Sequence, residues 1–190
     1  MKKFGSLLLI VCFLGLFSPS QGQNSFARIE LKNLDGETGS LGAKAGEKAT
    51  IFFFLSADCP LCENYSVTIN ELRKEYSAEE VVFMGIFAGK YVVEQDVRKY
   101  LQEFKPAVEV FLDPQYKLTK KLGATITPEV FAFDAEGELF YQGKIDNWLA
   151  SLGKYRTNIT RHYLKDALEA QLSGKPVPLA KTEAVGCFIE

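Results

Sequence analysis

The chain has 190 residues, which is enough for one domain with a sizeable core. Its hydrophobic content of 47% and its 15 phenylalanines indicate a globular protein rather than a disordered or fibrous one. The formal net charge is −2, and the two signs are interspersed along the sequence without a basic stripe. Because such a stripe is the electrostatic footprint of nucleic-acid binding, we expect no nucleic-acid partner.

The first 22 residues are typical of a secretory signal peptide. Lys2 and Lys3 precede an uncharged, mainly apolar run over residues 4–17, and small residues follow up to Gly22. The apolar run is shorter than the ~20 residues that a transmembrane helix needs. We therefore predict cleavage after Gly22, which would also remove Cys12, and a periplasmic or secreted mature chain without a membrane span. Retention as an uncleaved membrane anchor is the alternative.

The rest of the chain alternates predicted strands and helices, which indicates an α/β fold with a mixed sheet. Apolar runs or alternating apolar and polar residues predict strands at residues 26–31, 49–55, 81–87, 108–112, 129–133 and 138–142. Apolar residues three or four apart predict helices at residues 63–76, 93–104, 116–122 and 161–172. The glycine-rich residues 33–46 predict a loop or hairpin, and the turn at 134–137 joins the last two strands as an antiparallel hairpin.

Cys59 and Cys62 are separated by two residues and lie between a predicted buried strand and the helix that follows it. Free backbone N–H groups and the helix dipole favour a thiolate at this position, so the pair is suited to thiol–disulfide exchange. A purely structural disulfide would close too short a loop to constrain the unfolded chain much. A zinc site would need a second cysteine pair or a histidine pair. We expect Cys59 to be exposed and reactive, and Cys62 to be buried.

Together with Thr127-Pro128 at the head of a later strand, this pattern resembles the thioredoxin fold. The additional strand and helix between residues 81 and 112 resemble the redoxin branch, which includes the TlpA/ResA-like extracytoplasmic thiol oxidoreductases and the AhpC/TSA-type peroxiredoxins. The similarity covers roughly residues 26–172. With the signal peptide at 1–22, we therefore expect a thioredoxin-like redoxin domain at 23–172 and a C-terminal tail at 173–190 that carries Cys187.

The resemblance also implies roles for individual residues. Cys59 matches the attacking cysteine and Cys62 the resolving cysteine. Pro128 matches the cis-proline beside the disulfide, and Thr127 the residue whose backbone pairs with a substrate strand. The implied partners are protein or small-molecule disulfide or thiol substrates and an unidentified electron donor. No metal or organic cofactor is implied.

Two departures from the family patterns limit the activity that we expect. Asp58 and Phe53 occupy the positions of the tryptophan and the buried carboxylate of thioredoxin, which argues against efficient general reductase activity. The peroxiredoxin pattern matches at Ser56 but has Phe52 in place of its proline. A thiol peroxidase with antioxidant activity that uses Cys59 therefore remains an alternative.

Cys187 and His162 leave further alternatives open. Cys187 has no obvious partner among the three cysteines of the predicted mature chain. It is either a lone thiol in a flexible tail or a third redox cysteine on a tail that folds back over the active site, in which case we expect its sulfur to reach Cys59 within disulfide geometry. His162 is the sole histidine, and we expect it to face solvent. It would be a copper ligand if the protein were instead a copper-binding or redox-inactive partner-binding module of the same fold.

Overall fold

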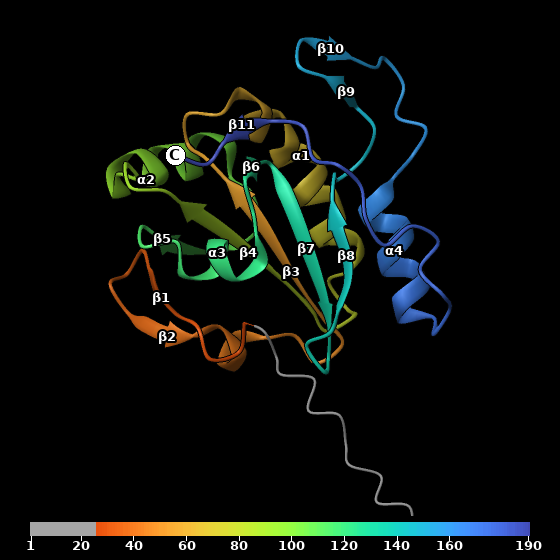
Figure 1. Cartoon of the computed structure of the whole chain (residues 1–190), viewed down its shortest axis with the longest axis horizontal. Helices are drawn as coiled ribbons and strands as arrows, with labels where there is room; N and C mark the ends of the chain where they lie inside the picture. The colour runs from red at the N-terminus through yellow and green to blue at the C-terminus, as the bar shows by residue number, and fades with distance from the viewer. Residues whose placement is uncertain (1–25) are drawn as a thin grey trace, which may run out of the picture.

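The computed structural model describes residues 26–190, so the predicted signal peptide and Cys12 lie outside the described residues. A seven-stranded mixed sheet forms the centre of the molecule (Figure 1). Its strands, in the order in which they lie side by side, are β2 (Thr38–Ser40), β1 (Glu30–Asn33), β5 (Glu109–Asp113), β4 (Val81–Ala88), β3 (Ala49–Leu55), β7 (Glu129–Asp134) and β8 (Leu139–Gly143). β3, β4 and β5 are parallel, and the other neighbouring pairs are antiparallel.

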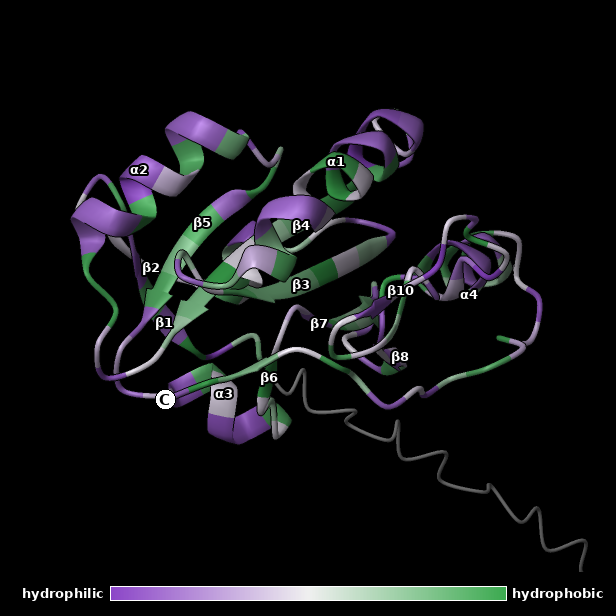
Figure 2. Cartoon of the chain, turned by 90° about the horizontal axis from the view of Figure 1, so that it is seen from above, coloured by the Kyte–Doolittle hydropathy of each residue, from purple (hydrophilic) through white to green (hydrophobic). Residues whose placement is uncertain are grey.

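Helices cover both faces of this sheet (Figure 2). The helices are α1 (Pro60–Glu75), α2 (Glu94–Phe104), α3 (Lys117–Leu122), α4 (Tyr163–Leu172) and a 3-10 turn, η1 (Leu41–Lys44). Side chains alternate between the two faces along β3: Ile51, Phe53 and Leu55 pack with α1, α2 and α4, whereas Phe52 and Phe54 pack with α3 and the N-terminal segment. Both faces of β3 are therefore buried, as its continuous apolar sequence predicts.

The thioredoxin-like α/β fold with a mixed sheet is confirmed, and most predicted elements lie within two residues of their observed bounds. The first predicted strand is wrong at its start. Residues 26–28 form a turn closed by a hydrogen bond from the Ile29 N–H to the Phe26 carbonyl (2.9 Å), and β1 begins only at Glu30. The Phe26 ring turns into the core between Phe52 and Phe133, which draws this segment out of the sheet.

Five short strands lie outside the predicted set. One is β2, at the edge of the sheet. The other four form two small two-stranded sheets: β9 (Leu149–Ser151) with β10 (Lys154–Tyr155), and β6 (Ile126–Thr127) with β11 (Cys187–Phe188). Within residues 26–190, no helix combines the length and the apolar character needed to cross a membrane.

Candidate active site

The Cys59–Cys62 segment lies where β3 gives way to α1. Residues 56–58 lead from the end of β3 to Cys59, which is the N-cap residue of α1 with extended backbone angles (φ −99°, ψ 109°). Pro60 follows at the first helical position, where its missing N–H costs no helical hydrogen bond. The Cys62 N–H donates to the Cys59 carbonyl (2.9 Å) and closes the first turn. The prediction that the cysteine pair opens a helix directly after a buried strand is confirmed.

Cys62 is fully buried beneath this turn. Burial raises the pKa of its thiol to about 12, although the Ser56 N–H, 3.4 Å from the sulfur, partly opposes the increase. At pH 7, about five units below this pKa, only ~10⁻⁵ of the Cys62 thiol is ionised. While the Cys59–Cys187 disulfide is present, Cys62 is therefore a protonated, inaccessible thiol.

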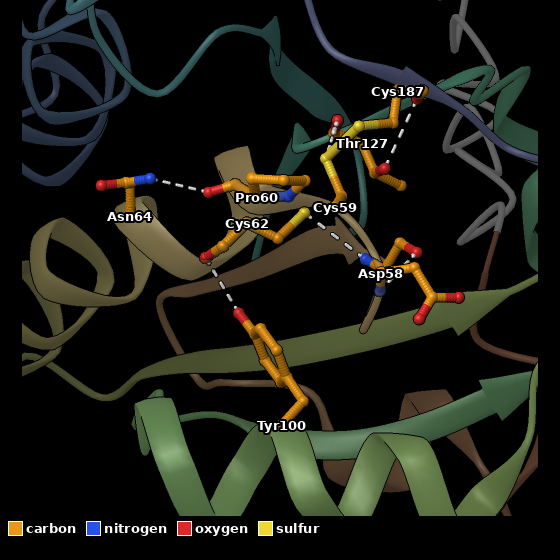
Figure 3. The surroundings of a disulfide bond; sticks show 9 residues. Asp58, Cys59, Pro60, Cys62, Asn64, Tyr100, Thr127 and Cys187 are labelled. Atoms are coloured by element: carbon orange, nitrogen blue, oxygen red, sulfur yellow. Dashed lines mark hydrogen bonds between the residues drawn. A yellow bond between two sulfur atoms is a disulfide. The ribbon is translucent and has the colours of Figure 1, made fainter.

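A polar network from α2 fixes the backbone around Cys62 (Figure 3). The Tyr100 hydroxyl donates to the Cys62 carbonyl (2.9 Å) and shares a hydrogen bond with the Ser66 hydroxyl (2.9 Å). All three residues are buried, so these bonds satisfy groups that would otherwise be costly to leave without partners. The network ties the active-site turn to the helix of the redoxin-type insertion.

The Thr127-Pro128 segment, which directly precedes β7, lies against the Cys59 sulfur. The peptide bond between these residues is cis, which confirms the prediction for Pro128. The Thr127 carbonyl oxygen lies 3.4 Å from the Cys59 sulfur, and both residues are buried. Thr127 also belongs to β6, so its backbone is available to pair with an extended strand.

That strand is supplied by the C-terminal segment of the same chain. β11 pairs antiparallel with β6, with Cys187 opposite Thr127 and Phe188 opposite Ile126. Cys187 forms a disulfide with Cys59, and their Cα atoms are 6.2 Å apart, within the usual range for a disulfide (Figure 3).

The expectation of an exposed Cys59 is wrong in this state. The Cys59 side chain is only 1% exposed, because Cys187 and its strand cover it, whereas Cys187 itself is half-buried.

A cavity of about 310 Å³ remains beside the disulfide. The active-site loop, the end of β4 and the start of α2 form most of its wall, and residues 187–190 close one side. Its lining includes the carboxylate side chains of Asp58 and Asp96 and the ring of Tyr91, which is 72% exposed. The backbone edge of Thr127 on this side is already occupied by β11.

Ser56, the hydroxyl residue of the peroxiredoxin-like pattern, lies close to both active-site cysteines. Its hydroxyl accepts a hydrogen bond from the Asp58 N–H (3.3 Å), while its own N–H points to Cys62. Phe52, which replaces the peroxiredoxin proline, is fully buried in the middle of β3. The hydroxyl thus helps to shape the loop before Cys59.

His162 is exposed, as predicted, and it is the N-cap residue of α4, although the predicted helix over residues 161–172 included it. Among the residues that the structure describes, no three His, Cys, Asp or Glu side chains come together as a metal-ligand group. Asp146 is a buried carboxylate that accepts from the Tyr65 hydroxyl of α1 (2.9 Å) and the Trp148 N–H (2.8 Å). Burial raises its pKa, and these two donors oppose the increase.

Several residues around the site were not expected from the sequence. Tyr100, Ser66 and Gly186 carry no sequence motif that would mark them as part of this site. The sequence does contain one signal for the tail: Cys187, without an obvious partner, lies in an apolar stretch that could pack against the fold. The alternative in which the tail folds back and brings Cys187 within disulfide reach of Cys59 is confirmed, since their Cα atoms are 6.2 Å apart.

Comparison with known proteins places this geometry in a family. The family model described as Redoxin matches residues 21–149, which is more than half of the chain. The chain belongs to the redoxin family. It is accordingly a redox enzyme of the thioredoxin type.

Individual relatives agree with this assignment. The redoxin is 28% identical over 128 residues to a thioredoxin-like protein of Haemophilus influenzae, covering 67% of this chain and 70% of the relative. An uncharacterised conserved protein of Geobacillus kaustophilus has a similar structure, with a TM-score of 0.74 at 24% identity over 85% of this chain and 87% of the other. A secreted disulfide oxidoreductase of Mycobacterium tuberculosis has the same fold, with a TM-score of 0.54 at 15% identity over 78% and 96% of the two chains.

Proposed function

We propose that this redoxin is an extracytoplasmic thiol–disulfide oxidoreductase that exchanges disulfides through Cys59 and Cys62. One observation carries the proposal: Cys59 is disulfide-bonded to a cysteine in an extended strand that pairs with Thr127. A mixed disulfide with an extended peptide substrate would need the same arrangement, with the sulfur at the start of α1 and the substrate backbone along β6.

The reaction starts with the Cys59 thiolate. It attacks one sulfur of a substrate disulfide, the substrate S–S bond breaks, and the second substrate sulfur leaves as a thiolate. Cys62 then loses its proton and attacks the Cys59 sulfur, which releases the first substrate sulfur and forms the Cys59–Cys62 disulfide. The substrate gains two electrons and the cysteine pair loses two. The reverse sequence oxidises a substrate dithiol.

The start of α1 favours the first step. Cys59 is the N-cap residue, where the helix dipole and free N–H groups of the first turn stabilise a negative charge. Cys62 is instead disfavoured as a thiolate, because full burial raises its pKa and keeps the thiol protonated. The two cysteines are therefore separated into an attacking and a resolving role by their positions on the first turn.

An extracytoplasmic location is supported by three features. Residues 1–22 have the charge and hydropathy pattern of a secretory signal peptide. The structurally similar Mycobacterium tuberculosis protein is described as secreted. A disulfide such as Cys59–Cys187 also persists more readily in an oxidising compartment than in the cytosol.

Turnover with a protein disulfide tests the proposal. The purified protein should catalyse reduction of insulin disulfides by dithiothreitol, and Cys59→Ser should lower the rate to the uncatalysed level. Ser173→Ala, on the exposed end of α4, is the matched surface control and should leave the rate unchanged. Equal rates for the wild type and Cys59→Ser would contradict the proposal. Consumption of hydrogen peroxide in place of insulin turnover would favour the thiol peroxidase alternative.

A further inference from the structure

The C-terminal segment, residues 173–190, is anchored to the fold by hydrogen bonds at residues 180–182 and 187–190. Beyond α4 it passes the end of β8 and crosses to β6 and the start of α2 (Figures 1 and 2). At β8, the Gln142 N–H donates to the Ala180 carbonyl and the Thr182 N–H donates to the Gln142 carbonyl, both at 2.9 Å. The Thr182 hydroxyl accepts from the Lys144 N–H (2.8 Å) and bonds the Tyr141 hydroxyl (2.8 Å). These bonds form the first anchor of the segment.

A second anchor surrounds the disulfide. β11 pairs with β6, and the Ile189 N–H donates to the Thr125 carbonyl (3.0 Å). One residue further on, the Lys90 N–H donates to the Glu190 oxygen (3.0 Å), which ties the segment to the loop before α2. Residues 180–190 thus make specific hydrogen bonds on both sides of Cys187, as an ordered element of a fold does.

Gly186 allows the C-terminal segment to lie close to the Thr127 backbone. A Cβ atom there would lie 2.1 Å from the Thr127 carbonyl oxygen, far inside contact distance. The approach of the two backbones beside the substrate-pairing residue therefore requires glycine. Gly39, by comparison, has open space around the position of its missing Cβ atom.

We propose that Cys187 is a second resolving cysteine: it takes the disulfide from Cys59, and the bond so formed holds β11 over the substrate-pairing edge. The inference rests on the proposed function, because it needs Cys59 as the attacking thiol. The C-terminal strand is then an internal substrate, and an external substrate must displace it to pair with Thr127.

Each step balances. A substrate disulfide reacts with the Cys59 thiolate, giving a Cys59–substrate mixed disulfide and one substrate thiolate. The Cys187 thiolate attacks the Cys59 sulfur, the Cys59–substrate bond breaks, and the second substrate thiolate leaves. The substrate gains two electrons, and Cys59 and Cys187 lose two. Afterwards Cys62 can displace Cys187 from Cys59, with Cys187 taking up the proton that Cys62 gives off and no net change in oxidation state.

Cys187 has two advantages over Cys62 in this competition. It is half-buried and lies on a strand that pairs with Thr127 whenever no external strand does, whereas Cys62 lies fully buried beneath the turn. Burial also raises the pKa of Cys62 to about 12, so its thiolate is scarce at neutral pH. We therefore expect the Cys59–Cys187 disulfide to form first and the Cys59–Cys62 disulfide to form more slowly from it.

Mapping the first disulfide tests this order. The purified protein is reduced, mixed with oxidised glutathione, quenched with acid at intervals and mapped by mass spectrometry. The wild type should form the Cys59–Cys187 bond at least tenfold faster than Cys59–Cys62. Gly186→Ala should lower the share of Cys59–Cys187 several-fold, and the matched control Gly39→Ala should behave as the wild type. Early formation of Cys59–Cys62 in the wild type, with Cys187 free, would overturn the proposal.

Cys62→Ser provides a second test that does not depend on the folding of the glycine variant. With Cys187 as resolver, this variant should still release both glutathione molecules and end with a Cys59–Cys187 bond. A stable glutathione adduct on Cys59 would overturn the proposal while leaving the proposed function intact. By contrast, absence of any reaction at Cys59, in Cys187→Ser as well as the wild type, would overturn the proposed function itself.

Discussion

The three cysteines of the described residues differ in bonding and in position. Cys62 is a free, buried thiol that is held in the protonated form, while Cys59 and Cys187 are joined by a disulfide at the start of α1. The sequence was sufficient to predict a buried Cys62, whereas the attacking role of Cys59 stays a prediction. A tail folded back over Cys59 was one of two alternatives for Cys187, and the pairing of this tail with β6 is what buries Cys59.

Cys62 should resist alkylation in the native oxidised protein. With a pKa of about 12, against an ordinary value of ~8.5, its thiolate at pH 8 is about three orders of magnitude scarcer than that of an exposed cysteine. Labelling with N-ethylmaleimide, followed by peptide mapping, should leave Cys62 unmodified until the protein is unfolded. A labelling rate within tenfold of that of free cysteine would contradict this picture.

Glu129, next to Pro128, should make stability depend on pH. It is buried, and it accepts from the Gln142 side chain (3.3 Å) and the Thr125 N–H (3.4 Å). Burial raises its pKa, an effect that these donors and Lys181 partly oppose. Because the folded pKa is the higher one, the contribution of Glu129 to folding is complete below its unfolded pKa of ~4.3 and is lost as the pH rises through the folded pKa.

Glu129→Gln removes this titration, and the Gln142 amide can reverse to keep its bond. We expect the unfolding free energy of the variant, relative to the wild type, to increase between about pH 4 and pH 7. Urea unfolding at several pH values measures it, with the exposed Glu138→Gln as a control that should show no such trend. A difference that stays constant with pH would show that Glu129 is not the titrating group.

The helices and strands differ in how clearly the sequence predicts them. β3, β4 and α1 carry long apolar or periodic runs, and their positions were predicted closely. β6 and β11 contain two residues each, too few for any periodicity, although their pairing lies directly beside the Cys59–Cys187 disulfide. Their pairing follows from the path of the whole chain, which no local pattern contains.

The first anchor of the C-terminal segment should depend on the Thr182 hydroxyl. Thr182→Val keeps the shape of the side chain but leaves the Lys144 N–H and the Tyr141 hydroxyl without this partner, at a cost of about 1–3 kcal/mol. Hydrogen exchange at the Thr182 and Lys144 amides should become at least tenfold faster. Thr182→Ser, which retains the hydroxyl, should exchange nearly as slowly as the wild type. Equal rates in both variants would mean that the hydroxyl does not hold the segment.

In the whole molecule, the Cys59–Cys187 disulfide joins the redoxin domain to the C-terminal segment. Strand–helix alternation, the cysteine pair and Thr127-Pro128 were enough to predict the family and the mixed sheet. The Cys59–Cys187 connection spans a sequence separation of 128 residues. The sequence left Cys187 either as a lone thiol or within reach of Cys59, and the three-dimensional path of the segment decides between these two alternatives.

This long connection should stabilise the folded protein. In the chain-entropy model, a disulfide closing a loop of this length lowers the unfolded-state entropy enough to add roughly 5 kcal/mol of stability. Guanidinium unfolding of Cys62→Ser, compared before and after reduction, isolates the Cys59–Cys187 bond. We expect a loss of several kcal/mol on reduction. A change below ~1 kcal/mol would mean that the segment is not fixed by this bond.

The central claim is that Cys59 is the thiol that attacks substrate disulfides. The most direct test uses the Cys62→Ser, Cys187→Ser double variant, in which neither proposed resolving thiol remains. After reaction of the reduced variant with oxidised glutathione, we predict one stable glutathione adduct on Cys59, found by peptide mass mapping. An unmodified Cys59 under conditions that modify an exposed cysteine peptide would contradict the account.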